Sequence, residues 1–313
     1  MYLLKECAEK LTNISQRREY SKPLEAECAQ KLETLREKGY VIFDHLVGTR
    51  EFLRLSDHVR SLFEIELKFR TPCLSQKLID QELHKNLIHK NFKAPLEDLR
   101  AGGLLFESTD VKTYDQVIRD YAPSTLTLDI PSQKQFFDVW LDSRVIEVIS
   151  GYMGFVPIMR EAFIRRNFPC NYTVMNHKWH RDTNHRSHLL KAFVFFTDCD
   201  LETGAHHYVP SSINDPRFRD GKYYEDDEID DAFPPEEGKQ MTSNVPAGTI
   251  ILEDTRGLHK AGIPVHSYRD LGFSVFVPNS FLHYDSPHYS VDLRTYGDLT
   301  DFQQQFIPKR NTV

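Results

Sequence analysis

A histidine and an aspartate two positions apart, His180 and Asp182, are the first residues in this sequence whose types and spacing suggest chemistry. They stand just before an apolar stretch, residues 188–196, with the composition of a buried strand. Side chains two apart on an extended segment point to the same side, so both can reach one metal ion. A second histidine from elsewhere would complete a face of two histidines and one carboxylate, which leaves coordination positions open on Fe(II).

The pair is not specific by itself, because a chain of this composition should contain His-x-Asp about once by chance. It occurs a second time at 283–285, between Ser280 and the Ser286 and Pro287 that follow, which are residues typical of a loop. The histidine nearest to it is His288, too close to come from a separate strand. We interpret the second pair as a surface turn and the first as the candidate site.

A second group of residues downstream supports the first pair. Gly248 marks a turn before a short apolar strand, His259 follows the strand, and Arg269 precedes another apolar strand that ends at Val277. In this order they supply a third metal ligand and a guanidinium whose planar fork matches a carboxylate. Each residue alone is more often structural than functional. Their joint order favours a site.

The composition limits the class of protein. A chain of 313 residues can form one large β-rich domain, and 21 Phe and 14 Tyr supply material for its core. The formal charge of −7 argues against a nucleic-acid partner, because such a partner requires clustered Lys and Arg. A small-molecule or protein substrate is the better expectation.

Cysteine usage and hydropathy indicate the cellular compartment in which the protein is expected. Five scattered cysteines without Cys-x-x-Cys predict neither a disulfide framework nor a zinc finger. The N-terminus meets charged residues too early for a signal peptide, and no apolar run approaches the roughly 18 residues of a spanning helix. We therefore expect a cytoplasmic protein with no membrane partner, and the sequence leaves its oligomeric state open.

Helical periodicity dominates before residue 157 and β patterns dominate after it. We expect helices within 1–38, 50–70 and 133–152, a strand at 40–43, and mixed loops with short helices over 71–130. Further strands are expected near 158–167, 172–179, 188–197, 205–209, 246–253, 259–264 and 271–277. Two apposed antiparallel sheets of this kind form a cupin-like double-stranded β-helix, or jelly roll. The predicted fold is mainly β with flanking helices.

The predicted organisation is a single domain, residues 1–313. Residues 1–157 would form a helical buttress with N-terminal strands, residues 158–279 the jelly-roll core, and residues 280–313 a C-terminal extension. An acidic insertion at 213–245 interrupts the core, and its length and its Gly and Pro hinges suggest a mobile lid over the mouth of the jelly roll. Four aromatic side chains of this lid could close over a substrate, namely Phe218, Tyr223, Tyr224 and Phe233. The alternative is a solvated surface loop.

These motifs together resemble the phytanoyl-CoA dioxygenase family of Fe(II)- and 2-oxoglutarate-dependent oxygenases over about residues 31–277. The resemblance rests on Glu37–Ile42, Trp179–Asp182, Leu201–Ala205 leading to Val209–Ser212, and Pro246–Thr249, followed by His259 and Arg269. Ordered motifs over this distance are specific for the superfamily and weak for the substrate.

The resemblance implies roles for individual residues. His180, Asp182 and His259 would bind iron, and Arg269 would hold the distal carboxylate of 2-oxoglutarate, with Lys191 as the alternative anchor. The implied reaction consumes O2 and 2-oxoglutarate, hydroxylates a small molecule, and releases succinate and CO2. Strand parity also suggests side chains that could line a substrate pocket, namely Phe163, Arg165, Trp179, Phe195 and Tyr208.

Other functions could use the same ligands. A non-catalytic cupin-like protein could bind a metal or ligand without turnover, a zinc hydrolase could activate water, and a hydroxylase could act on a basic peptide that meets the acidic insertion. Arg269 argues against the hydrolase, because a carboxylate anchor has no role there. The fold alone does not choose among these functions.

Overall fold

The computed structural model describes residues 20–67, 119, 124–182, 189–279 and 289–313. The helix expected before residue 20, most of the region 71–130 and the second His-x-Asp pair lie outside these residues. Within them, no helix is long and apolar enough to cross a membrane.

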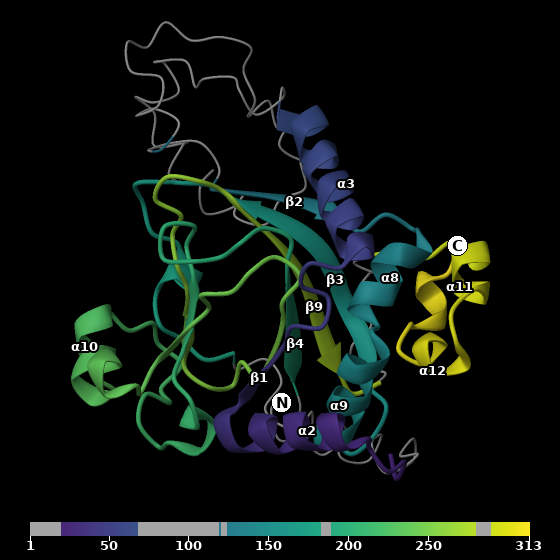
Figure 1. Cartoon of the computed structure of the whole chain (residues 1–313). Coiled ribbons are helices and arrows are strands. Elements are labelled where there is room, and N and C mark those ends of the chain that lie inside the picture. Colours follow the sequence, from purple (N-terminus) through teal and green to yellow (C-terminus); the bar gives the residue numbers. More distant parts are fainter. Residues whose placement is uncertain (1–19, 68–118, 120–123, 183–188, 280–288) are drawn as a thin grey trace, which may run out of the picture.

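Two antiparallel sheets form the centre of the molecule (Figure 1). The larger sheet has the spatial order β1 (Tyr40–Phe43), β7 (Ile250–Glu253), β4 (Leu190–Phe195), β9 (Arg269–Val277), β3 (Ile158–Asn167) and β2 (Thr125–Asp129). The smaller has the order β6 (Met241–Thr242), β5 (His206–Tyr208) and β8 (His259–Ala261). A hydrogen bond from His206 to Glu253 and a ring contact between His206 and Phe193 join β5 to the inner face of the larger sheet. The two sheets are the walls of a double-stranded β-helix, as the sequence predicts.

The pleat of β4 separates an inner from an outer face. Phe193 and Phe195 point inward into a cluster with residues of β7 and β9, whereas Ala192 and Val194 point outward. The outward residues pack beneath helices α2 (Ala26–Lys38), α3 (Arg50–Leu67), α8 (Lys134–Trp140) and α9 (Ser143–Met153). Figure 1 shows α3, α8 and α9 along this side of the sheet, with α2 across its end. The inner face is therefore left to form the interior of the barrel.

The C-terminal residues belong to the same core. Helices α11 (Leu293–Gly297) and α12 (Asp301–Gln304) lie beside α8 in Figure 1. Phe306 is fully buried in the outer cluster, and its ring contacts Phe276 of β9 edge-on. The Tyr289 hydroxyl donates to the carbonyl of Met159 at 2.6 Å. The extension thus completes the packing of the outer face.

Three elements differ from expectation. The helix predicted at 133–152 is two helices, because the Asp142 side chain accepts hydrogen bonds from the backbone N–H groups of Arg144 and Val145 and so begins α9 anew. β2 lies in a region where we expected loops, and it forms by pairing with β3 at the sheet edge. Most of 172–179 is not a strand; it contains a 3₁₀ turn at Met175–His177.

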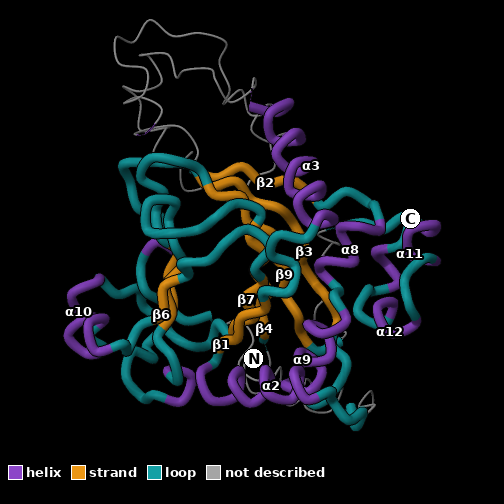
Figure 2. Tube along the Cα trace, viewed as in Figure 1, coloured by secondary structure: helices purple, strands orange, loops and turns teal. Residues whose placement is uncertain are grey.

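The acidic insertion packs as a small layer of its own. It contains α10 (Asp226–Ala232) and β6, which lie together on the far side of the molecule from α3 and α8 (Figure 2). Its apolar residues join residues that lie next to β5, β8 and His180 in one buried cluster: Trp179, Val209, Tyr224, Ile229, Phe233 and Leu258. Three of the four aromatic side chains expected to close over a substrate, Phe218, Tyr224 and Phe233, are engaged in this cluster instead. Mobility of the segment stays a prediction.

Candidate metal centre

Backbone pairing brings the two histidines together. His180 lies opposite His259 in an antiparallel bridge, and each residue donates its N–H to the carbonyl of the other at 3.0 Å. Side chains opposite each other in an antiparallel pair share a face, and the two rings have centroids 4.3 Å apart. Asp182, two residues on, follows the same side and donates its N–H to the carbonyl of Thr255 at 2.8 Å. One potential ligand atom from each of His180, Asp182 and His259 lies within 4.8 Å of the others.

Both imidazoles are held in the tautomer that a metal ligand needs. The Nδ1 atom of His180 is 2.8 Å from the carbonyl oxygen of Lys178, and Nδ1 of His259 is 3.0 Å from that of Gly257. A carbonyl oxygen only accepts, so each Nδ1 carries the proton and each Nε2 presents its lone pair. Burial, together with the neighbouring His180 ring, holds the pKa of His259 well below its usual range. It is therefore neutral and able to bind a cation.

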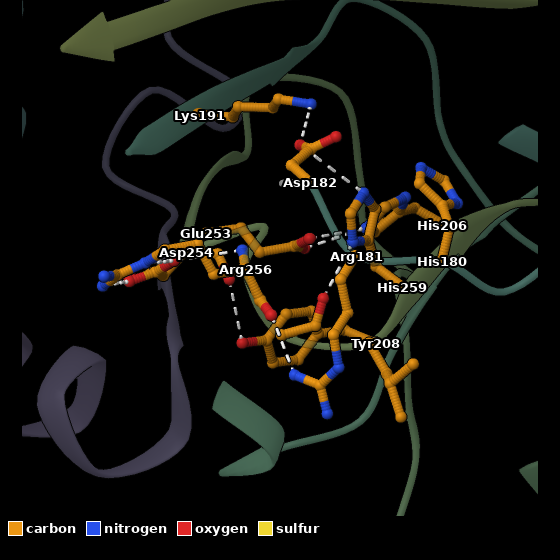
Figure 3. A network of polar contacts seen from close by, with 12 residues as sticks. His180, Arg181, Asp182, Lys191, His206, Tyr208, Glu253, Asp254, Arg256 and His259 are labelled. Carbon is orange, nitrogen blue, oxygen red and sulfur yellow. Dashed lines mark hydrogen bonds and ion pairs between the residues drawn. The ribbon is translucent and has the colours of Figure 1, made fainter. Parts of the chain in front are cut away.

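Asp182 and Lys191 form an ion pair at the inner surface of the barrel (Figure 3). Burial acts to raise the pKa of Asp182, but the charges of Lys191 and His259 and the hydrogen bonds from Lys191 and Thr255 together outweigh it and lower this pKa well below the usual range. The carboxylate is thus ionised. Its Oδ2 atom is 3.9 Å from Nε2 of His259, so it faces the same point as the imidazoles.

Arg181, between the two ligands, points the opposite way and clamps the backbone around the site. Its guanidinium donates to the carbonyls of Ser212 and Arg256 at 2.8 Å and of Phe218 at 3.0 Å. These carbonyls belong to the insertion and to the turn before His259, so one side chain ties both segments to the His180–Asp182 strand. Sequence reasoning missed this residue. The available signal was its position between two ligands of the same parity, which directs its side chain to the opposite face.

A second set of contacts fixes the turn that leads to His259. The buried Asp254 carboxylate accepts from Tyr152 Oη and from Arg256 Nε, each at 2.8 Å. Tyr208 donates its hydroxyl to the carbonyl of Asp254 at 3.1 Å. Tyr208 therefore holds the turn from inside the protein and is fully buried. Its expected role in lining a substrate pocket stays a prediction.

A buried His–Glu pair, which we did not predict from the sequence, lies beside the metal ligands. Nε2 of His206 is 2.9 Å from one oxygen of Glu253 and 3.0 Å from the other. The His206 ring is centred 5.7 Å from that of His259. Burial raises the pKa of Glu253 well above its usual range and, with the charge of Arg269, lowers that of His206 to about 3. His206 comes from β5 and Glu253 from β7, so their pairing depends on the fold. The only signal in the sequence was that both positions were expected to point into the barrel.

Arg269 lies at the start of β9 and is buried at 2% exposure. Its guanidinium donates to the carbonyl of Gly204 and, at 3.5 Å, to the side-chain oxygen of Asn167. Its Nε atom is buried and makes no hydrogen bond within the described residues. A buried donor without an acceptor is costly, so this atom is suited to a ligand that brings an oxygen.

The other expected pocket residues fall into two groups. Phe163, Arg165 and Phe195 lie on the inner face; the guanidinium of Arg165 is 5.3 Å from the Phe163 ring, and Phe195 belongs to the inner cluster. Trp179 is in the cluster beneath α10, because it is adjacent to His180 and so points the other way. Tyr223, the fourth of the aromatic residues expected to close over a substrate, has its ring centred 5.7 Å from that of His180.

The donor set fits divalent iron. Two neutral imidazoles with Nε2 lone pairs and one carboxylate are the ligands that non-haem Fe(II) takes in oxygenases, and they also suit zinc. Arg269, with its buried Nε donor in the same interior, suits a co-substrate that carries a carboxylate.

Neither a family model nor a curated protein matches the sequence. Among solved structures, the epimerase SnoN with Fe3+, alpha-ketoglutarate and nogalamycin RO is 13% identical, with 92% of this chain and 98% of that chain covered and a TM-score of 0.49. EctD from S. alaskensis, with 2-oxoglutarate and 5-hydroxyectoine, is 12% identical over 95% and 88%, with a TM-score of 0.48. HygX from Streptomyces hygroscopicus, with nickel, 2-oxoglutarate and hygromycin B, is 15% identical over 86% and 91%, with a TM-score of 0.46. At these values the similarities assign neither activity nor substrate to this chain.

Proposed function

We propose that the protein is an Fe(II)- and 2-oxoglutarate-dependent dioxygenase that hydroxylates a small molecule and releases succinate and CO2. One observation carries the proposal. His180, Asp182 and His259 converge inside a double-stranded β-helix, with both histidines in the metal-binding tautomer. The resemblance of the sequence motifs to the phytanoyl-CoA dioxygenase family supports the same reading.

The residues have separate tasks in this function. His180, Asp182 and His259 hold the metal, which when bound supplies the redox chemistry that couples 2-oxoglutarate decarboxylation to oxidation of the substrate. Arg269 binds the distal carboxylate of 2-oxoglutarate. Arg181 keeps the ligand strand, the insertion and the 254–258 turn in one arrangement. The apolar inner wall, which includes Phe193 and Phe273, excludes water from the reacting groups.

Binding tests the site before any substrate is known. Fe(II), added without oxygen, should raise the thermal midpoint of the wild type, because a ligand that binds only the folded state stabilises it. 2-Oxoglutarate should raise it further in the presence of the metal. His259→Ala and His180→Ala should lose at least about tenfold in metal affinity, whereas His266→Ala, which removes an exposed histidine, should not. Wild-type metal affinity in His259→Ala would refute the ligand assignment.

Turnover separates the alternatives. Incubation with Fe(II), 2-oxoglutarate, O2 and a metabolite extract should yield succinate and a compound that has gained one oxygen atom, as seen by mass spectrometry. Binding of metal and 2-oxoglutarate without succinate would identify a non-catalytic binding protein. Metal binding without any response to 2-oxoglutarate would favour a zinc hydrolase. Oxygen gained by peptides alone would indicate a peptide hydroxylase.

A further inference from the structure

Strand β5 connects the neighbourhood of Arg269 with that of the metal ligands. The carbonyl of Gly204, just before the strand, accepts a hydrogen bond from the Arg269 guanidinium. At the other end of the strand, Tyr208 is paired with His259 in the register of β5 and β8. His206 is two residues from Gly204 and two from Tyr208, a stretch of chain at most roughly 7 Å long in either direction. It therefore lies midway along the strand between the two parts of the site.

The His206 side chain lies in the space between the two sheets. Its ring is centred 5.7 Å from that of His259, its diagonal neighbour on β8, and 5.1 Å from that of Phe193 on the inner face of β4. Besides burial, the charges of Arg269 and Lys191 act to lower the pKa of His206. The ring is therefore next to a metal ligand and within the electrostatic range of Arg269.

Two sets of contacts fix the His206 ring in this place (Figure 3). Nε2 of His206 is 2.9 and 3.0 Å from the two carboxyl oxygens of Glu253, which is fully buried. The His206 backbone N–H donates to Oγ of Ser243 at 2.8 Å, and the His206 carbonyl accepts from the Ser243 N–H at 2.9 Å. A buried polar pair is costly compared with apolar side chains of similar size. What this pair provides in return is an imidazole of defined orientation inside the barrel.

One ring nitrogen of His206 is left for a ligand. Glu253 engages Nε2, whereas Nδ1 makes no hydrogen bond to any residue that the structure describes. Imidazole can donate or accept a hydrogen bond at this atom, according to its tautomer. A polar atom without a partner inside a protein is costly. Nδ1 of His206, like Nε of Arg269, is therefore suited to a bound molecule that supplies a polar atom.

2-Oxoglutarate is the molecule that has to pass this nitrogen. In the proposed function it binds the metal through one end, and its distal carboxylate is held by Arg269. With both ends fixed in this way, it runs alongside β5 past the His206 ring. Of the described residues, the group able to hold the metal consists of His180, Asp182 and His259. His206 is therefore placed to act on the co-substrate rather than on the metal.

We propose that His206 contacts bound 2-oxoglutarate through Nδ1, and that Glu253 is a positioning residue that holds the ring in the orientation this contact requires. The inference rests on the proposed function, because it concerns the same co-substrate. It adds two residues that the sequence motifs do not include. Because His206 is not a metal ligand, its effect on 2-oxoglutarate can be measured separately from metal binding.

Two substitutions of His206 separate ligand contact from packing. The amide of a glutamine lies near the place of the imidazole Nε2, so His206→Gln keeps the bond to Glu253 and loses Nδ1. The amide of an asparagine lies near the place of Nδ1, so His206→Asn keeps that group and loses the bond to Glu253. The measurement is calorimetric titration of 2-oxoglutarate into the Fe(II)-loaded protein under nitrogen. His206→Gln should bind 2-oxoglutarate about fivefold or more weakly than the wild type, and His206→Asn less than about threefold more weakly.

The role of Glu253 is tested in the same titration. Glu253→Leu, which cannot bond to Nε2, should weaken 2-oxoglutarate binding about as much as His206→Gln does. Glu253→Gln, which still can, should remain within about threefold of the wild type. If His206→Gln does not fold, as judged by its thermal midpoint, this second comparison decides the same question.

Two controls accompany these variants. His207→Gln changes the neighbouring histidine, whose Nδ1 lies 3.1 Å from Oγ1 of Thr242 on β6 and whose ring lies beside Trp179; it should keep wild-type affinity for 2-oxoglutarate. The Fe(II) affinity of every variant, measured without 2-oxoglutarate, should stay within about threefold of the wild type.

Three results would overturn the inference. The first is wild-type affinity for 2-oxoglutarate in folded His206→Gln. The second is the opposite order, with His206→Asn weaker than His206→Gln, which a residue that only pairs with Glu253 would give. The third is a loss of Fe(II) affinity as large as the loss of 2-oxoglutarate affinity, which would mean that the pair acts through His259. If 2-oxoglutarate does not bind the Fe(II)-loaded wild type, the proposed function fails and the inference fails with it, whereas each of the three results above contradicts the inference alone.

Discussion

At the scale of single residues, the site depends on which nitrogen of each imidazole carries the proton. Backbone carbonyls two residues before His180 and His259 hold both Nδ1 protons. This arrangement orients both rings before a metal binds. The conformational entropy of the two side chains is therefore lost on folding rather than on metal binding. Each histidine contacts the carbonyl oxygen of the residue two positions before it, so the hydrogen bond is local in the sequence. The preparation of the site is thus largely a property of two short segments.

The same scale separates the two candidate anchors for 2-oxoglutarate. Lys191 is engaged by Asp182, whereas Arg269 has a buried Nε donor without a partner in the described part of the chain. We expect Arg269→Ala to raise the 2-oxoglutarate concentration for half-saturation about ten- to a hundredfold, because a charge-assisted contact contributes about 1.5–3 kcal/mol. Lys191→Met should change it less than about threefold. Calorimetric titration of the Fe(II) protein under nitrogen measures both.

A larger effect in Lys191→Met than in Arg269→Ala would transfer the anchor to the lysine. Arg144→Gln serves as the control, because that side chain is exposed on α9.

At the scale of elements, the insertion is attached to the site by packing as well as by charge. Ile229 of α10 is fully buried against the cluster that contains Trp179 and Leu258. Lys178 and Lys260 form ion pairs with Glu225 and Asp226 at its surface. Such exposed pairs contribute little, so the buried apolar contacts hold α10 in place. The segment can act as a lid only if this cluster opens.

Ile229→Ala tests how the insertion is held. Removal of a buried isoleucine side chain costs about 2–5 kcal/mol, and here the cost should appear first as local opening of α10. We expect trypsin and chymotrypsin to cut within 214–244 at least about tenfold faster in this variant than in the wild type, with the rest of the chain protected. The exposed neighbour Asp227→Ala is the control. Equal cleavage rates in the variant and the wild type would mean that the cluster does not restrain the segment. Fast cleavage of the wild type that slows when metal, 2-oxoglutarate and substrate are added would support a mobile lid.

At the scale of the whole molecule, the outer face of the larger sheet joins regions far apart in the sequence. Arg166 of β3 forms a bidentate ion pair with Asp270 of β9, both bonds being 2.6 Å, and both side chains are buried. The guanidinium also lies 4.5 Å from the Phe63 ring of α3 and 3.8 Å from the Tyr268 ring. This contact anchors α3 to the strand that begins with Arg269. The outer face therefore fixes the position of an inner-face residue.

Acid should destabilise the folded protein partly through His177. Its pKa is lowered to about 4 by burial and by Arg269 and Arg165, whereas an unfolded histidine titrates near 6.5. As pH falls from about 6.5 to 4, the unfolded chain takes up a proton that the folded protein does not. The free energy of unfolding should therefore fall over this range, by at most about 3 kcal/mol from this residue.

Urea unfolding of the wild type and His177→Asn between pH 4.5 and 7.5 checks the effect of His177. The asparagine oxygen can still accept from Val174 N–H, as Nδ1 of His177 does at 3.2 Å. The variant should lose less stability than the wild type as the pH falls, because the titrating carboxylates are common to both. Parallel profiles would show that His177 titrates normally in the folded protein.

Features that depend on local pattern could be predicted from the sequence. The strand at 40–43 and the strand at 158–167 have the bounds expected from β-branched and aromatic runs. The helix that ends at Gly39 stops there because that residue adopts a left-handed conformation, with φ of 83°. The spacing of His180 and Asp182, and the order of His259 and Arg269 after them, identified the candidate site. Period-two alternation and turn chemistry act over a few residues, so they can be read from the chain.

Features that depend on contacts between segments far apart in the sequence became evident only in the folded protein. The position of Trp179 next to His180 already directs it away from the metal, but its contact with the insertion depended on the pairing of 179 with 224. The approach of His206 to Glu253, and of Arg165 to Arg269, follows from sheet facing and register rather than from spacing in the sequence. β2 forms because its backbone pairs with the edge strand β3. The insertion is ordered because its apolar residues are buried against Trp179, Val209 and Leu258. These features are stabilised by contacts between residues many tens of positions apart, which local secondary-structure propensity does not describe.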